Sequence, residues 1–414
     1  MTNRTPLPQP YFDSLNQMLS DDYTYEPPID GLNLEGYLIA KKFLLSYKGS
    51  QDTFNAYRRD TERFLQWCQL VANKSLVKIQ REEFESYLAF CQKPPKTWIG
   101  LRNEPRFIVK NGKRVVNKKW RPFVSSLSKA DKKLGKNHDK NTYCLSEKAF
   151  KALFAIISTF YNFLIQEGYV AINPVILIRQ KSKYLKKTHI EPKIRRLSEL
   201  QWGYVLETAE IASEKNPERY ERSLFILNAL YGMYLRISEL TVTERWAPTM
   251  GDFERDLDGH WWFNTVSKGN KARKITVSDA MLKALKRYRK SRGLPTLPHV
   301  AEDTPLISKT RTTEPVKSVR YIRVLVQEIF DEAIVRLEND NQAEEAEQLA
   351  AATVHWLRHT GISDDVKIRP REHVRDDAGH SSSAITDKYI DIELRERHLS
   401  GKKKRIKPKC MLNS

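Results

Sequence analysis

Apolar residues recur at helical spacing through most of the first 175 residues. The pattern predicts amphipathic helices over residues 34–47, 54–71, 82–90 and 146–166. Gly168 and Pro174 end the last of these, because glycine commonly follows a helix and proline cannot continue one. We therefore expect a helical first domain over residues 34–175, preceded by an N-terminal extension over residues 1–33 that lacks a clear period.

Residues 106–116 depart from this helical pattern. After Arg106 the chain reads Phe-Ile-Val-Lys-Asn-Gly-Lys-Arg-Val-Val, which is two β-prone runs on either side of Asn111-Gly112. An Asn-Gly pair favours the tight turn that joins the two strands of a hairpin. The sequence therefore predicts a β-hairpin inside the first domain.

A second domain is predicted over residues 197–395. A helical region runs from Ser198 to about Tyr234, and residues 261–277 alternate like two strands that turn at Gly269-Asn270. Helical patterns then resume at Asp279 and continue almost to the C-terminus. The fold class is thus mainly α with a small β-sheet (α+β), in two domains.

Charge changes this picture most. The net charge is +20 and the isoelectric point is about 9.6, so the field of the protein attracts polyanions, chiefly nucleic acid or an anionic membrane. No run of about 18 apolar residues and no signal-like N-terminus is found, which disfavours a membrane partner. The four cysteines form no Cys-x-x-Cys pair, so we expect no metal site and no disulfide framework. This cysteine usage fits a reducing, intracellular compartment. We expect a cytoplasmic, nucleoid-associated protein.

The positive charge is concentrated in three segments. In the insertion at residues 93–143, fifteen Lys and Arg residues stand against three Asp and Glu residues up to position 140. Residues 176–196 form a basic linker, and residues 396–414 form a basic C-terminal tail. The candidate DNA contacts in the first two segments are Lys110, Lys113, Arg114, Lys183, Lys186 and Lys187. The hairpin is equally well interpreted as a solvated surface insertion, since charge runs usually face water.

Candidate chemistry begins with His355-Trp356-Leu357-Arg358-His359-Thr360. His355 and Arg358 are three residues apart and share a helical face, but such a pair is common on protein surfaces. Its meaning depends on other segments. Leu-Arg-Ile-Ser-Glu-Leu at 235–240 closes an apolar helix, and Ser-Lys-Gly-Asn-Lys-Ala-Arg at 267–273 sits at a hairpin turn. Gly379-His380 and Tyr389 follow further along the chain.

In this order, the segments resemble the tyrosine recombinases, or phage integrases, over about residues 195–395. The resemblance implies that Arg236 and Arg358 clamp a DNA phosphate and that Lys268 is the hairpin lysine. It assigns His355 and His380 as the histidine pair, Tyr389 as the nucleophile and Glu239 as the carboxylate that orients them. Lys271 and Arg273 flank the same hairpin and are further candidate DNA contacts.

The resemblance also implies how the protein acts. A helical core-binding domain and a catalytic domain would close as a C-shaped clamp on double-stranded DNA recombination sites. A homotetramer would assemble on paired sites, with a dimer on each site. The resemblance leaves open whether accessory DNA-bending proteins or a recombinase partner take part. A mobile genetic element is the expected source.

The chemistry can be argued from the residues alone. The transition state of phosphoryl transfer concentrates charge on the non-bridging oxygens, so two Arg forks lower the barrier. A tyrosine hydroxyl has a pKa of about 10 and needs a base, for which His355 is the candidate, and Lys268 can protonate the leaving oxygen. Because a phosphotyrosine replaces one phosphodiester by another, we expect no ATP, metal or other cofactor.

Two segments depart from the family pattern. Met233-Tyr234 precedes Arg236 where the family commonly has a small residue and glycine, and residues 361–378 carry Asp364, Asp365, Asp376 and Asp377 where apolar residues are usual. Two rival functions stay open. A type IB topoisomerase uses the same phosphotyrosine chemistry, and a non-catalytic DNA-binding factor could keep the fold.

Overall fold

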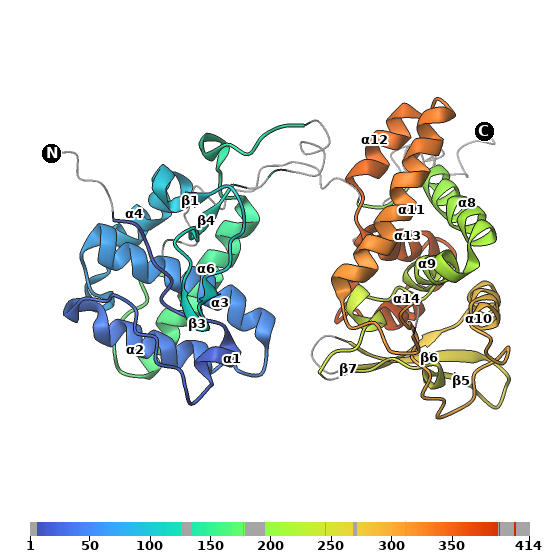
Figure 1. Cartoon of the computed structure of the whole chain (residues 1–414), viewed down its shortest axis with the longest axis horizontal. Coiled ribbons are helices and arrows are strands. Elements are labelled where there is room, and N and C mark those ends of the chain that lie inside the picture. The colour runs from blue at the N-terminus through green and yellow to red at the C-terminus, as the bar shows by residue number, and fades with distance from the viewer. Residues whose placement is uncertain are drawn as a thin grey trace, which may run out of the picture. The chain divides into compact units, whose positions relative to one another are not determined.

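The computed structural model describes residues 6–125, 127, 135–176, 178, 195–244, 246–267, 271–310, 312–387, 389 and 401–402. The chain divides into two compact units, Met1–Glu191 and Pro192–Ser414 (Figure 1). Each unit has its own apolar core. The division falls within the basic linker at residues 176–196, most of which lies outside the described residues.

Unit 1 is built of helices packed around aromatic side chains. Its helices are α1 (Leu15–Met18), α2 (Gly31–Leu45), α3 (Gln51–Trp67), α4 (Arg81–Gln92) and α6 (Glu147–Gln166), and a π-helical turn at Cys68–Ala72 continues α3. Four of these helices confirm the sequence prediction. Helix α6 is long and apolar enough to cross a membrane, but eight of its residues are buried in the core of unit 1, where Phe160 packs against Phe43 of α2.

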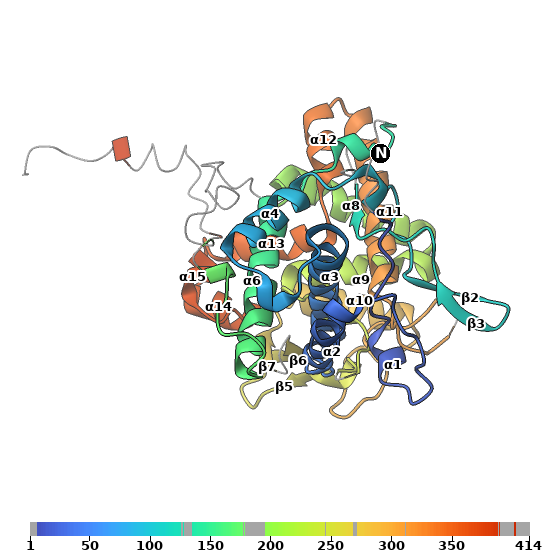
Figure 2. The same ribbon diagram turned by 90° about the vertical axis from the view of Figure 1, so that its left-hand side faces the viewer.

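The predicted hairpin is present as β2 (Phe107–Lys110) and β3 (Lys113–Val116). Asn111 and Gly112 both have positive φ, 50° and 72°, as the tight turn requires. The strands β1 (Ile99–Gly100) and β4 (Phe123–Val124) pair in parallel before and after the hairpin and so bring the two ends of this segment together. The hairpin extends away from the helices of unit 1 (Figure 2).

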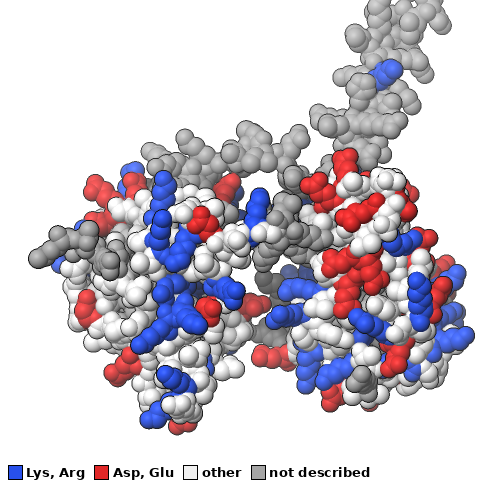
Figure 3. Space-filling view, turned by 45° about the horizontal axis from the view of Figure 1, so that its top comes forward, with Lys and Arg blue, Asp and Glu red and all other residues white. Residues whose placement is uncertain are grey.

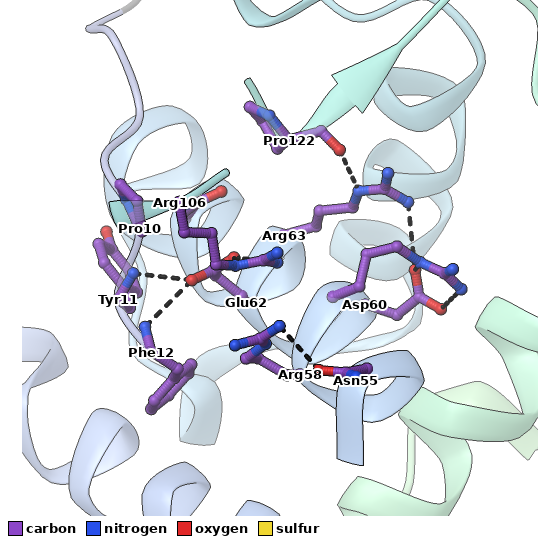
Figure 4. A network of polar contacts seen from close by, with 12 residues as sticks. Pro10, Tyr11, Phe12, Asn55, Arg58, Asp60, Glu62, Arg63, Arg106 and Pro122 are labelled. Carbon is purple, nitrogen blue, oxygen red and sulfur yellow. Dashed lines mark hydrogen bonds and ion pairs between the residues drawn. The ribbon is translucent and has the colours of Figure 1, made fainter. Parts of the chain in front are cut away.

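The N-terminal segment packs into unit 1. Tyr11 and Phe12 are buried, and their main-chain N–H groups donate to Oε1 of Glu62 at 2.8 and 3.1 Å (Figure 4). Arg106, from the start of the hairpin, donates to the other carboxylate oxygen of Glu62 at 2.8 Å. A buried carboxylate therefore joins three segments that lie far apart in the sequence.

Unit 2 places its helices around α9. The elements are α8 (Glu199–Lys215), α9 (Pro217–Gly232), β5 (Phe253–Arg255), β6 (Trp261–Ser267), β7 (Lys271–Thr276), α10 (Asp279–Ser291), α11 (Val319–Asn339), α12 (Ala343–Ala351), α13 (Val354–Asp365), α14 (Arg371–Ala378) and α15 (Ser383–Asp387). Helix α9 contacts α8, α10, α11 and α13, and the antiparallel sheet has the order β5-β6-β7. The α+β fold class is confirmed.

Two expectations for this unit are wrong. No helix occurs among the described residues of 292–318, because Pro295, Pro298, Pro305 and Pro315 interrupt it. Leu235–Leu240 does not close a helix, since α9 ends at Gly232 and Arg236 is extended before a 3₁₀ turn at Ile237–Leu240. Residues 331–348 carry seven Asp and Glu residues and cover the end of α11 and most of α12. Asp and Glu side chains gather on the upper part of unit 2 in Figure 3.

Candidate active site

Arg358 comes from α13, which is held unusually close to α9. A side chain at Gly361 would place its Cβ 2.1 Å from the carbonyl oxygen of Tyr231, so glycine is required where the two helices meet. Arg358 is only 3% exposed, and its guanidinium donates to the carbonyl oxygens of Tyr234 and, at 2.6 Å, Ala378. His355, one turn earlier, is exposed.

Arg236 is held by Glu239 from the following 3₁₀ turn. The carboxylate of Glu239 accepts from the main-chain N–H of Arg236 at 2.8 Å and from its Nη1 at 3.1 Å. The guanidinium also lies 3.5 Å from the carbonyl oxygen of Gly379. Glu239 is buried, so it fixes the guanidinium from the protein side.

A second arginine shares Glu239. Arg273 of β7 donates from Nη1 and Nη2 to the two oxygens of Glu239 at 3.0 and 2.9 Å, and its side chain is 7% exposed. Sequence reasoning placed Arg273 among the DNA contacts. The structure gives it a buried ion pair, and a Cβ at Gly379 would lie 2.9 Å from its Cδ.

His380 follows the left-handed end of α14. Gly379 has φ 64°, and the main-chain N–H of His380 donates to the carbonyl oxygen of Arg375 at 3.1 Å, which closes the helix. The ring nitrogen Nδ1 of His380 lies 2.9 Å from the hydroxyl oxygen of Thr386 in α15. This contact fixes the ring and leaves Nε2 as the nitrogen that can meet a ligand.

Tyr389 lies against two imidazole rings. Its ring centroid is 5.2 Å from that of His359 and 5.5 Å from that of His380, with interplanar angles of 29° and 14°. His359 also meets His355 edge to face at 4.7 Å. Stacking of this kind restricts the rotation of the Tyr389 ring.

These side chains line one cavity of about 520 Å³. Its lining is Arg236, Lys271, Ala272, Arg273, His355, Arg358, Gly379, His380, Ser381, Ile385 and Tyr389. The structure therefore brings together five of the six predicted catalytic residues. Lys268, the sixth, lies outside the described residues, as do Lys183, Lys186 and Lys187. Lys110, Lys113 and Arg114 lie on the hairpin of unit 1.

The cavity is strongly cationic. Burial and the neighbouring Arg236 and Arg273 lower the pKa of Arg358 to about 9. Burial and the charge of Arg358 lower the pKa of His380 to about 4, and burial followed by the neighbouring His355 lowers that of His359 to about 4. All three side chains therefore disfavour a further positive charge, as expected of a site that awaits an anion.

His355 and Tyr389 both line the cavity, and their pKa values shift in opposite directions. Desolvation, Arg358 and Arg236 lower the pKa of His355, so this imidazole is neutral at pH 7. Burial raises the pKa of Tyr389, whereas Arg358 and Arg236 oppose the rise. The phenol is therefore protonated at pH 7 and requires a base to become a nucleophile.

Sequence reasoning missed several residues of the site. Neither the shared use of Glu239 by Arg273 nor the contact between Thr386 and His380 leaves a sequence signal, because both are made across the fold. His359 was detectable as a histidine beside Arg358 in the same motif. One group with metal-ligand geometry occurs among the described residues, Asp256, Asp258 and His260, and it is mostly exposed and outside the cavity lining.

Comparisons with known proteins give one partial match by sequence and wider matches by fold. No protein-family model matches the chain. It is 26% identical over 150 residues to the tyrosine recombinase XerD of Rickettsia conorii, a match that spans 36% of this chain and 46% of that protein.

Two solved structures share the fold across most of the chain. A lambda integrase dimer bound to a COC′ core site is 14% identical with a TM-score of 0.51, covering 95% of this chain and 87% of that one. The Tn1549 transposon integrase in complex with a circular intermediate DNA is 16% identical with a TM-score of 0.51, covering 88% and 98%. The fold is therefore that of the tyrosine recombinases, and the resemblance drawn from the sequence motifs is confirmed.

Proposed function

We propose that the protein is a tyrosine-type site-specific recombinase, which cleaves and rejoins DNA strands through a 3′-phosphotyrosyl intermediate without ATP or metal. One observation carries the proposal. Tyr389 lines a cavity together with three arginines and two histidines that belong to four separate segments of unit 2. Chance rarely assembles such a set around one tyrosine.

The arginines supply the charge that the reaction needs. Arg236 and Arg358 are both fixed by protein acceptors and both line the cavity, so their guanidinium groups can meet the non-bridging oxygens of a phosphodiester without reorganisation. His380 can donate from Nε2 to the same phosphate. In this scheme the two guanidinium groups do the work that a metal ion performs in other phosphoryl-transfer enzymes.

The proposal also assigns a residue to each proton step. His355 accepts the Tyr389 proton as the phenol attacks phosphorus, and the bond to the 5′ oxygen of the deoxyribose breaks. That oxygen takes a proton from Lys268. Lys271 is the alternative proton donor, because its side chain lines the cavity. The 5′ hydroxyl of another strand then attacks the phosphotyrosine in reverse, which restores a phosphodiester and the tyrosine.

The partner is double-stranded DNA at recombination sites, held by a clamp of both units in the cytoplasm at the nucleoid. The proposal also includes a homotetramer on paired sites, with a dimer on each site. Accessory DNA-bending proteins or a recombinase partner complete it. It rests on the net charge of +20 and on the shared fold. The lambda integrase dimer is bound to a COC′ core site, and the Tn1549 integrase is in complex with a circular intermediate DNA.

The hairpin is proposed as an additional DNA contact. Its tip carries the exposed Lys110 and Lys113 beside the exposed Val109. Arg114 differs, because it donates two hydrogen bonds of 2.6 Å to the buried Asp13 and so ties β3 to the N-terminal segment. The lysines are therefore the stronger candidates for contact with phosphates.

Trapping of a covalent adduct tests the function. A nicked DNA substrate that loses a short fragment on cleavage should leave the wild type joined to DNA, whereas Tyr389→Phe should bind equally and form no adduct. An adduct that persists in this variant would assign the nucleophile elsewhere. A plasmid relaxation assay, run beside a two-site strand-exchange assay, separates a recombinase from a type IB topoisomerase. If the wild type forms no covalent adduct, a non-catalytic DNA-binding factor is favoured.

A further inference from the structure

Four side chains behind the cavity form a connected polar network. Tyr234 is 1% exposed and donates its hydroxyl to Asp365 at the end of α13. Arg369 donates to the hydroxyl oxygen of Tyr234 at 3.0 Å and to Asp365 at 3.1 Å. Its other nitrogen donates to Asp377 of α14 at 2.7 Å.

The network ends on the sheet. Asp377 accepts from the main-chain N–H of Thr276 in β7 at 3.1 Å. It therefore joins the segment after α9 to α13, α14 and β7. Arg358 lies in α13, Arg273 in β7 and His380 just after α14. Each of the two carboxylates has a cationic partner, as a partly buried acid requires.

Tyr234 connects this network to Arg358 through its backbone. Its φ is 50°, a left-handed conformation that ordinarily favours glycine. In this conformation its carbonyl oxygen accepts a hydrogen bond from Nη1 of Arg358, and Ala378, next to Asp377, accepts from Nη2. Both acceptors of the Arg358 fork thus belong to segments that the network holds.

We infer that Tyr234, Asp365, Arg369 and Asp377 are positioning residues that aim Arg358 at the scissile phosphate. The inference rests on the proposed function. It links the two departures of the sequence from the family pattern. Tyr234, in place of glycine, bonds to Asp365. Arg369 then connects Asp365 to Asp377, and both acids stand in place of apolar residues. A burial-driven rise in the pKa of Tyr234 keeps its hydroxyl protonated as a donor.

The test compares two tyrosines of the same region. Tyr234→Phe removes the hydroxyl that joins Asp365, whereas Tyr231→Phe removes an equivalent bond of 3.0 Å to Asp364 that does not reach Arg358 or Asp377. Strand cleavage by Tyr234→Phe should slow on the order of 10- to 100-fold, with noncovalent DNA affinity nearly unchanged. Tyr231→Phe should cleave at nearly the wild-type rate. Equal rates in the two variants would overturn the inference.

A neutral phosphate separates positioning from general damage. A methylphosphonate at the scissile position lacks one anionic oxygen, so it depends less on an aimed guanidinium. The slowing of Tyr234→Phe relative to the wild type, and that of Asp377→Asn, should shrink at least several-fold on this substrate. Slowing of the same size on both substrates would mean a merely structural role.

Failure of the proposed function gives a different result. If the wild type forms no adduct at all, the recombinase proposal fails while the network can still be tested by calorimetric titration with inorganic phosphate. Tyr234→Phe should then raise the dissociation constant of phosphate several-fold and Tyr231→Phe should not. Unchanged phosphate binding in both would overturn the positioning role independently.

Discussion

The two units each contain a cluster of three arginines, and the clusters differ in how their charge is balanced. In unit 1, Arg58, Arg106 and Arg114 meet the buried Glu62 and Asp13, with Arg58 bonded to the carbonyl oxygen of Asp13 and to Asn55. In unit 2, Arg236, Arg273 and Arg358 meet one carboxylate, Glu239, and three carbonyl oxygens.

The difference indicates what each cluster does. Carbonyl oxygens fix a guanidinium but do not cancel its charge, so the cavity keeps a positive potential that an anion can satisfy. Carboxylates cancel the charge and tie segments together. We therefore expect changes in the cavity to alter rates and changes in the unit 1 cluster to alter stability.

Lys268 gives the largest expected effect. Lys268→Ala should slow cleavage of ordinary DNA by roughly 100- to 10,000-fold, because the 5′ oxygen leaves poorly without a proton. Sulfur in place of that oxygen leaves as a thiolate, so cleavage of the sulfur substrate should be largely restored. If both substrates are cleaved equally slowly, Lys271 or a histidine is the acid, and Lys271→Ala is the matched variant to measure.

The contrast between the two clusters is tested by Arg236→Ala and Glu62→Gln. Arg236→Ala should cleave both substrates on the order of 100- to 1000-fold more slowly, since the non-bridging charge stays unneutralised. Glu62→Gln should leave the cleavage rate unchanged but lower the free energy of unfolding by about 2–3 kcal/mol, because Arg106 loses its buried partner. The contrast fails if Arg236→Ala shifts the denaturant midpoint of unfolding and Glu62→Gln changes the cleavage rate.

The hairpin lysines sharpen the comparison from the unit 1 side. Replacing Lys110 and Lys113 by Ala should flatten the slope of log affinity against log salt by about 0.9 for each lost phosphate contact. Replacing Lys118 and Lys119, which are exposed but outside the strands, provides a charge-matched control. The same slope in the hairpin variant and the wild type would make the hairpin a solvated insertion.

The pH dependence of stability is the smallest effect. His359 and His380 have pKa values of about 4 in the folded protein, against about 6.5 when unfolded. The unfolded state therefore binds more protons between pH 6.5 and 4, so stability is full above pH 6.5 and falls as the pH drops through this window. Thermal unfolding should show a lower Tm at pH 5 than at pH 7, and the drop should be smaller in His359→Phe, whose ring still stacks on Tyr389.

The sequence predicted the helices and the hairpins well because their periods and turns are local. Gly168 and Asn111-Gly112 act on neighbouring residues, and the structure confirms both signals with positive φ at all three residues. The ordered list of motifs also identified five residues that meet in one cavity. What it could not show is which groups pair across the fold, such as Arg273 with Glu239 or Tyr234 with Asp365, since these partners are 34 and 131 residues apart.

The attachment of the N-terminal segment has a practical consequence for anyone who trims the protein. Cutting at the start of α2 would uncover the core around Phe12 and strip Glu62 and Arg114 of their partners in the first 30 residues. The shortened chain should be prone to aggregation and to proteases, even though every residue of the cavity is retained. Affinity tags are therefore better joined through a linker ahead of Met1 than substituted for the first 30 residues.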